Sequence, residues 1–124
     1  MSKRRSQTEH DRLVEYVAKL LIGRGYSDVR ADIPGYEEPL RIKWQKKGEG
    51  FCPDVSGNKE GLRIFEVETG DSIDDEHTEA QWKLFASFAE SNNAMFYVVF
   101  PKGCADKVKA RLAQLSIKAV LMEV

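Results

Sequence analysis

The sequence predicts an α/β fold with helices on the faces of a central sheet, and two observations lead to this prediction. Residues 94–100 form a continuous apolar run, as expected for a strand in the middle of a sheet. From residue 68 onward, segments with helical and strand periodicity alternate. Strand–helix–strand units connect parallel neighbours through right-handed crossovers, so the later strands are expected to be parallel.

Composition limits the classes of protein to consider. The 124 residues suffice for one domain with its own core. A content of 42% hydrophobic and 31% charged residues is typical of a globular chain, and a formal net charge of −1 excludes a polycation. Cys52 and Cys104 form neither a metal-ligand spacing nor a disulfide framework. No segment reaches transmembrane length and no apolar run follows the basic N-terminus, so we expect a cytoplasmic protein without a membrane partner.

The first predicted element is an amphipathic helix at residues 7–22, which two glycines end. Its buried face is expected to carry Leu13, Val14, Val17, Leu20 and Leu21. Glu9 lies four residues before Leu13 and would extend this face toward the helix N-terminus. Alternatively, Ser6 and Glu9 are the two ends of a capping box, in which Glu9 serves only the backbone. The sequence leaves both roles open.

Alternating residues predict strands at 29–33 and 40–44. In the second strand, Leu40, Ile42 and Trp44 are expected to face inward. The outward-facing residues and the following loop form a basic strip that consists of Arg41, Lys43, Lys46 and Lys47. Such a strip is either a solvated face that protects an edge strand or a set of phosphate contacts.

Three carboxylates lie between residues 50 and 81 at a spacing that favours a shared site. The strand predicted at 62–67 is largely apolar, and side-chain alternation puts Glu66 and Glu68 on one face. If Asp54 comes from a neighbouring strand, it joins them. A buried carboxylate cluster costs free energy unless it is hydrogen-bonded, protonated or neutralised by a metal. A hard divalent cation would relieve the repulsion.

The remaining elements alternate between helix and strand. The helix predicted at 76–91 is expected to bury Gln81, Leu84, Phe85 and Phe88. A glutamine on an apolar face needs hydrogen-bond partners, either in the core or in a site. A helix at 105–115 and a strand at 117–122 complete the chain. Cys104, next to that helix, matches no nucleophile pattern.

Four motifs resemble those of the PD-(D/E)XK nuclease superfamily, which has the restriction-endonuclease-like fold. Gly50-Phe-Cys-Pro-Asp54 resembles its GxxPD strand, and Glu66-Val-Glu68 resembles its E-x-K strand. Glu9 stands where many members have an acidic residue on the first helix. Gln81-Trp-Lys-Leu-Phe85 is similar to the Q-x-x-x-Y helix of the RecB-like branch, with Phe in place of Tyr. The resemblance covers residues 9 to about 100.

The resemblance implies both a fold and an activity. The fold would be a restriction-endonuclease-like mixed central sheet flanked by helices, in the order helix–strands–helix–strand–helix–strand, over a single domain at 1–124. The activity would be that of a Mg²⁺- or Mn²⁺-dependent phosphodiesterase, an endo- or exodeoxyribonuclease in which activated water attacks the scissile phosphate. The partner would be DNA, bound by a homodimer or within a larger DNA-processing complex.

The resemblance also implies roles for individual residues. The metal ligands would be Asp54, Glu66, the Val67 carbonyl and, through water, Glu9. The catalytic group would comprise Asp54 and Glu66 with Glu68 as general base or second-metal ligand and Gln81 to orient a carboxylate or the substrate. The basic strip Arg41, Lys43, Lys46 and Lys47 would bind substrate.

One departure from the superfamily pattern keeps other interpretations open. Glu68 occupies the position of the usual lysine, although some restriction enzymes also have Glu there; Lys83 and Lys102 are candidates for the missing cation. A second interpretation is a non-catalytic module on the same fold that binds nucleic acid or a partner protein. A third is that Glu66 and Glu68 are solvated at a strand end and only the fold is shared.

Overall fold

The computed structural model describes residues 5–43 and 50–124, and the side chains of 7–43 and 50–124. Its first half contains α1 (Arg5–Gly23), β1 (Ser27–Ala31), β2 (Ile42–Lys43), β3 (Gly50–Phe51), β4 (Val55–Asn58) and β5 (Leu62–Val67). Its second half contains α2 (Glu76–Asn92), β6 (Met95–Phe100), α3 (Ala105–Leu115) and β7 (Val120–Glu123). Among the described residues, no helix combines the length and apolar character needed to cross a membrane.

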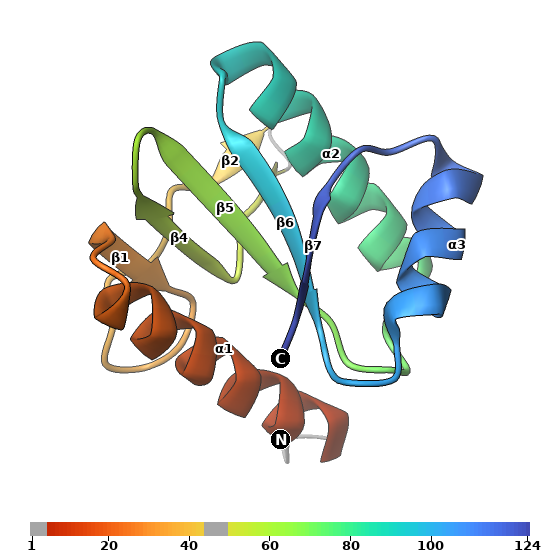
Figure 1. Cartoon of the computed structure of the whole chain (residues 1–124), viewed down its shortest axis with the longest axis horizontal. Coiled ribbons are helices and arrows are strands. Elements are labelled where there is room, and N and C mark those ends of the chain that lie inside the picture. Colours follow the sequence, from red (N-terminus) through yellow and green to blue (C-terminus); the bar gives the residue numbers. More distant parts are fainter. Residues whose placement is uncertain (1–4, 44–49) are drawn as a thin grey trace.

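The central sheet is mixed and has the strand order β1-β4-β5-β6-β7. β4 pairs antiparallel with both β1 and β5, whereas β5, β6 and β7 are parallel. Figure 1 shows α1 on one side of these strands and α2 and α3 on the other. The predicted α/β class, the helices on the sheet faces and the parallel later strands are therefore confirmed. The restriction-endonuclease-like assignment stays a prediction.

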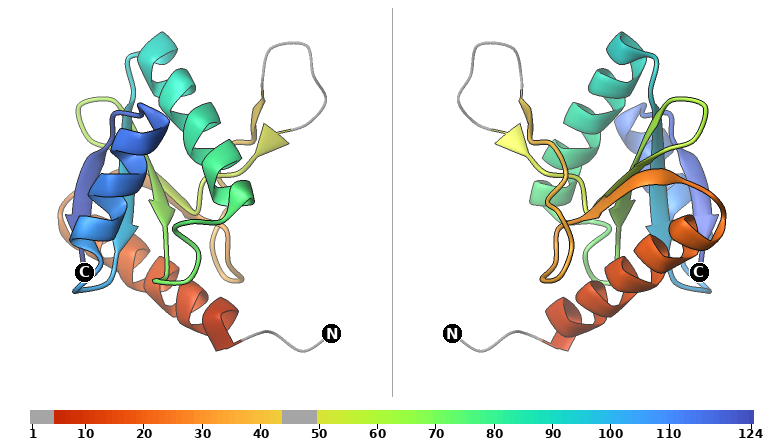
Figure 2. Two further views of the ribbon diagram at one scale, coloured as in Figure 1. Left: turned by 90° about the vertical axis from the view of Figure 1, so that its right-hand side faces the viewer. Right: turned by 90° about the vertical axis from the view of Figure 1, so that its left-hand side faces the viewer.

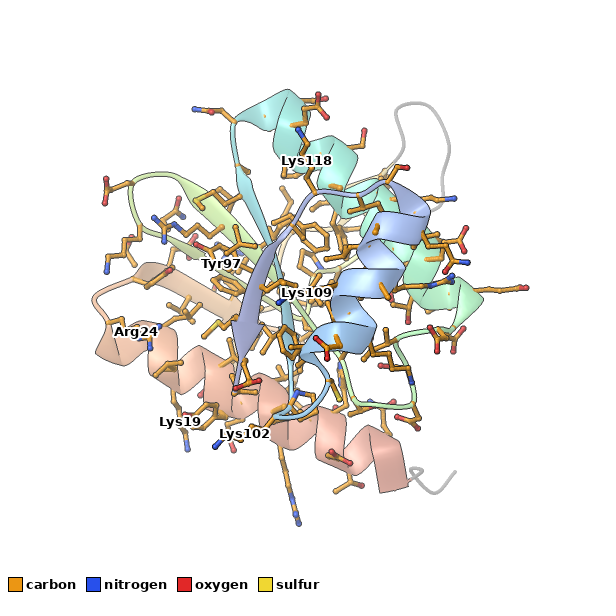
Figure 3. All side chains as sticks on the ribbon, turned by 45° about the vertical axis from the view of Figure 1, so that its right-hand side comes forward. Lys19, Arg24, Tyr97, Lys102, Lys109 and Lys118 are labelled. Carbon is orange, nitrogen blue, oxygen red and sulfur yellow. The ribbon has the colours of Figure 1, made fainter. Side chains whose placement is uncertain are left out.

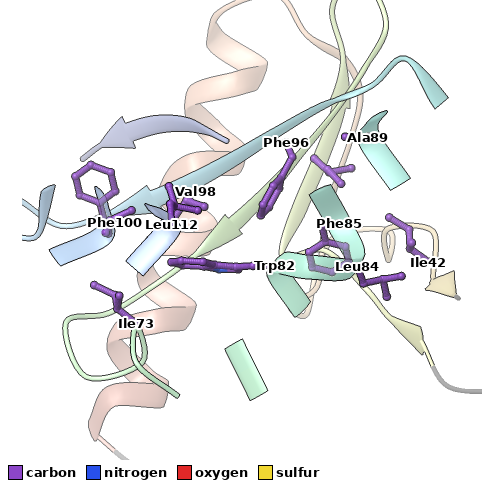
Figure 4. Packing of buried hydrophobic residues seen from close by; sticks show 12 residues of the cluster. Ile42, Ile73, Trp82, Leu84, Phe85, Ala89, Phe96, Val98, Phe100 and Leu112 are labelled. Carbon is purple, nitrogen blue, oxygen red and sulfur yellow. The ribbon is translucent and has the colours of Figure 1, made fainter. Parts of the chain in front are cut away.

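Two hydrophobic clusters hold the helices on opposite faces of β5. Phe65 and Val67 pack in one cluster with the buried side of α1, which carries Val14, Val17, Ala18 and Leu21. Ile64 packs in the other with α2, α3 and β6, and Figure 4 shows Trp82, Phe85 and Phe96 at its centre. Burial of each large side chain contributes about 2–3 kcal/mol. The alternation along β5 thus decides which helix each side chain meets.

The segment between β1 and β4 departs from the predictions. The strand expected at 40–44 is limited to Ile42–Lys43 among the described residues, and Leu40 is 70% exposed, so its predicted inward position is wrong. β2 pairs with β3 in a separate two-stranded sheet beside α2 (Figure 2). The Phe51 ring contacts His77 and Phe85 with centroids at 5.1 and 6.5 Å, so aromatic contacts attach this hairpin to α2. Trp44 lies outside the described residues.

Candidate functional site

The end of β5 and the residue before β4 bring three carboxylates into one region. Glu66 lies near the end of β5, and Glu68 directly follows the strand, where its N–H donates to the Val99 carbonyl at 2.8 Å. Asp54 precedes β4, whose first residue pairs with Phe65. Antiparallel pairing therefore places Asp54 beside Glu66. Both glutamates are buried.

Asp54 and Glu66 each accept a hydrogen bond from the backbone of the other segment. The Asp54 N–H donates to Glu66 Oε1 at 3.0 Å, and the Val67 N–H donates to Asp54 Oδ2 at 2.8 Å. The two carboxylates thus satisfy backbone groups where the β4–β5 ladder ends. In these two bonds the accepting atoms are Oε1 of Glu66 and Oδ2 of Asp54.

His10 from α1 also contacts Asp54. Its Nε2 lies 3.2 Å from Asp54 Oδ2, and its Nδ1 lies 3.4 Å from Asp11 Oδ1. Burial by itself lowers the pKa of His10, but the hydrogen bond and charge of Asp54, helped by Asp11 and Glu68, outweigh burial and raise the pKa to about 9. His10 is therefore a cation at neutral pH, in contact with one carboxylate of the cluster.

Glu68 is held by hydrogen bonds to both of its oxygens. Ser72 Oγ donates to Oε1 at 2.6 Å, and Trp82 Nε1 donates to Oε2 at 3.0 Å. The Thr69 N–H donates to Ser72 Oγ at 3.0 Å, which stabilises the turn after β5. Because Trp82 is fully buried on α2, Glu68 joins the strand end to that helix.

Both glutamates have raised pKa values. Burial, followed by the charges of Asp54 and Glu68, raises the pKa of Glu66 well above its usual range. Burial also raises the pKa of Glu68 to about 7, although the hydrogen bonds from Ser72 and Trp82 oppose the shift. A proton or a bound cation is therefore favoured at this cluster.

The donor set suits a hard cation with few protein ligands. Carboxylate oxygens are the ligands that Mg²⁺ prefers, and Mg²⁺ commonly binds one or two carboxylates while water and phosphate complete its shell. Within residues 7–43 and 50–124, no group of three or more His, Cys, Asp or Glu side chains is arranged to hold a metal ion. A metal site at Asp54 and Glu66 therefore stays a prediction.

Glu9 is separate from the cluster. Its side chain is exposed, so the prediction that it extends the buried face of α1 is wrong. α1 already includes Ser6, which therefore cannot precede the helix as the first residue of a capping box. His10, one position later, has the orientation that had been expected of Glu9.

The other predicted site residues are distributed over several elements. On α2, Leu84 and Phe85 are buried as predicted, whereas Gln81 is only half-buried and its neighbour Trp82 lies fully in the core. Val67 contributes its N–H to Asp54, and its carbonyl as a ligand stays a prediction. In the basic strip, Arg41 and Lys43 are exposed, while Lys46 and Lys47 lie outside the described residues.

Neither candidate lysine contacts the carboxylates in the part of the chain that the structure describes. Lys83 Nζ bonds Glu79 Oε2 at 2.8 Å on the exposed side of α2. Lys102 is exposed in the turn after β6, where Figure 3 labels it. The cation beside the cluster is His10 instead.

Three side chains of the cluster were missed from the sequence, and two of them had a detectable signal. His10 precedes Val14 by four positions and Val17 by seven, which places it on the buried stripe of α1. Trp82 carries an N–H that needs a partner when it is buried. Ser72 lies in a turn whose shape depends on tertiary contacts, so no pattern in the sequence points to its role.

Comparisons with known proteins assign neither a family nor a function to this site. The side chains of the cluster therefore have to support any functional conclusion themselves. We found no match among protein-family models, among curated proteins or among solved structures.

Proposed function

We propose that this chain is a phosphodiesterase that cleaves DNA with Mg²⁺ or Mn²⁺ and binds the cation through Asp54 and Glu66. The observation that carries the proposal is their reciprocal bonding, in which Glu66 Oε1 accepts from the Asp54 N–H and Asp54 Oδ2 accepts from the Val67 N–H. Both carboxylates are thereby fixed next to each other. Burial and neighbouring charges raise the pKa of Glu66, and a divalent cation relieves that repulsion.

The residues of the chain have distinct tasks in this proposal. A bound divalent cation supplies an activated water and neutralises charge on the phosphate. Asp54 and Glu66 hold it, and the Val67 N–H fixes Asp54. Glu68 would accept the proton of the attacking water, and the leaving oxygen would take a proton from bulk water. For this step, Ser72 or Trp82 has to release one Glu68 oxygen.

Nucleic acid as the substrate is supported by the motif resemblance and by the adjacent hairpin. Arg41 and Lys43 are exposed, and β3 ends at Phe51, shortly before Asp54. Arg41 Nη1 donates to the Gly50 carbonyl at 2.7 Å, which joins the two sides of the hairpin. Arginine and lysine contacts to phosphates position a nucleic acid without specifying its sequence.

The second candidate function is a catalytically inactive module of the same fold that binds nucleic acid or a partner protein. Glu68 favours it, because both of its oxygens accept hydrogen bonds and its side chain is only 3% exposed. A general base must reach the proton that it removes. In this alternative, His10 is the counter-ion of Asp54, and the cluster connects α1 to β4 and β5.

Cleavage of end-labelled DNA with Mg²⁺ or Mn²⁺ tests the leading proposal. We expect the wild type to cleave single-stranded, duplex or branched DNA, and Asp54→Asn and Glu66→Gln each to lower the rate by about 100-fold or more, because each removes a charged ligand. Glu90→Gln, an exposed change on α2, is the matched control and should retain the wild-type rate.

A wild type that cleaves none of these substrates with either cation would exclude the nuclease proposal. Fluorescence anisotropy with labelled DNA then tests the second candidate. Binding that Arg41→Ala and Lys43→Ala weaken, and that Asp54→Asn leaves unchanged, would support the inactive module.

A further inference from the structure

His10 connects α1 to the carboxylate pair through a chain of side-chain hydrogen bonds. Gln7 Nε2 donates to Asp11 Oδ1 at 3.1 Å, and the same oxygen lies 3.4 Å from His10 Nδ1. His10 Nε2 in turn lies 3.2 Å from Asp54 Oδ2. The ring is therefore oriented at both nitrogens, with Asp54 at one end and Asp11 at the other.

We infer that His10 is a positioning residue that sets the orientation of the Asp54 carboxylate for cation binding. This inference rests on the function proposed above. Two donors, the Val67 N–H at 2.8 Å and His10 Nε2 at 3.2 Å, converge on the same oxygen, Oδ2. They approach from different elements, β5 and α1, so together they restrict rotation of the carboxylate. Oδ1 of Asp54 is then the oxygen presented to a cation.

The geometry distinguishes this role from that of a metal ligand. A histidine ligand binds a cation through the lone pair of a ring nitrogen. In His10, both ring nitrogens already face carboxylate oxygens, at 3.2 Å and 3.4 Å. His10 therefore acts on the cation through Asp54. Hydrogen-bond partners of metal-binding carboxylates commonly change metal affinity by about 10–100-fold when they are removed.

The test measures Mn²⁺ affinity of the full chain by isothermal titration calorimetry, with the melting temperature in EDTA as a separate measure of folding. We expect His10→Ala to weaken Mn²⁺ binding by about 10-fold or more. His10→Gln should bind Mn²⁺ within a few-fold of wild type, because the amide keeps an N–H donor toward Asp54. Lys19→Ala removes one positive charge from an exposed site on the same helix and is the control for net charge.

Each alternative has its own outcome. Tighter Mn²⁺ binding by His10→Ala would overturn the inference, because His10 would then compete with the cation. Equal weakening in His10→Gln and His10→Ala would make His10 a ligand. An unchanged affinity in His10→Ala would make it a bystander. Should His10→Ala fail to fold, His10→Asn replaces it, since asparagine is too short to reach Asp54.

The proposed function fails in a different way. If neither the wild type nor the Lys19→Ala control binds Mn²⁺, the cation site itself is absent and both proposals fall. If Mn²⁺ binds and Asp54→Asn abolishes binding while His10→Ala does not change it, the cation site stands and only the role of His10 is overturned.

Discussion

The hydrogen bond that Glu66 accepts does not require a negatively charged side chain. Its side chain is 2% exposed, and Oε1 accepts one bond, from the Asp54 N–H. A glutamine carbonyl oxygen supplies the same acceptor. The negative charge therefore costs folding free energy in the absence of a cation, since burying a charge is unfavourable without a partner.

We expect Glu66→Gln to stabilise the metal-free protein at pH 8 by about 1–2 kcal/mol, because the variant removes charge repulsion with Asp54 and Glu68. Thermal melts in EDTA should show a melting temperature higher by roughly 5 °C. Added Mn²⁺ should raise the melting temperature of the wild type and change that of the variant much less. Glu90→Gln is the control, and a variant less stable than wild type in EDTA would contradict the prediction.

Glu68 makes stability depend on pH. Its pKa rises from 4.5 to about 7 on folding, so the folded state binds more protons between these values. Its contribution is fully present below pH 4.5 and is lost as the pH rises through 7, by an amount on the order of 3 kcal/mol. His10 acts with the same sign in a higher window, from 6.5 to about 9.

Chemical denaturation between pH 4.5 and 8 measures this dependence. The free energy of unfolding of the wild type should fall over that range, and in Glu68→Gln the part of the decline centred below pH 7 should disappear. A wild-type profile that stays flat from pH 5 to 7.5 would show that Glu68 has an ordinary pKa.

At the scale of elements, the sequence predicted the helices and most of their buried positions, and the errors lie at single positions on each helix. On α1, the buried residues Val14, Val17 and Leu21 define a stripe that begins at His10. Counting back from Leu13, which is only half-buried, gives Glu9 instead. An error of one position rotates a helix by about 100°. The residue at this end of the buried stripe is therefore His10 and not the predicted Glu9.

On α2, the burial of Trp82 in place of the predicted Gln81 decides which side chain meets Glu68. We expect Trp82→Phe to destabilise the protein by about 2–4 kcal/mol, since it removes ring volume from the core and leaves Glu68 Oε2 without its indole donor. A double-mutant cycle with Glu68→Gln measures the coupling. A coupling energy near zero would show that the 3.0 Å bond contributes nothing beyond packing.

For the whole molecule, apolar runs and their alternation sufficed to predict an α/β chain with parallel later strands. The antiparallel half of the sheet did not follow from them, because β1 and β4 are short and only pairing with β5 defines their register. The convergence of Asp54 with Glu66 depends on that register. The motif resemblance predicted that Asp54 and Glu66 lie close together. The hydrogen bonds from His10, Ser72 and Trp82 could be found only in the structure.

The separation of these residues along the chain has a consequence for biosynthesis. Asp54 and Glu66 are 12 positions apart, so β4 and β5 close a short loop, whereas His10 precedes Asp54 by 44 positions. During translation α1 and the adjacent β1 leave the ribosome well before β4 and β5. The part of the α1 stripe that packs with Val55, Phe65 and Val67 therefore waits several seconds for them at about 5–20 residues per second. The helix that carries His10 thus keeps part of its apolar stripe available to chaperones and to premature association while the chain is still growing.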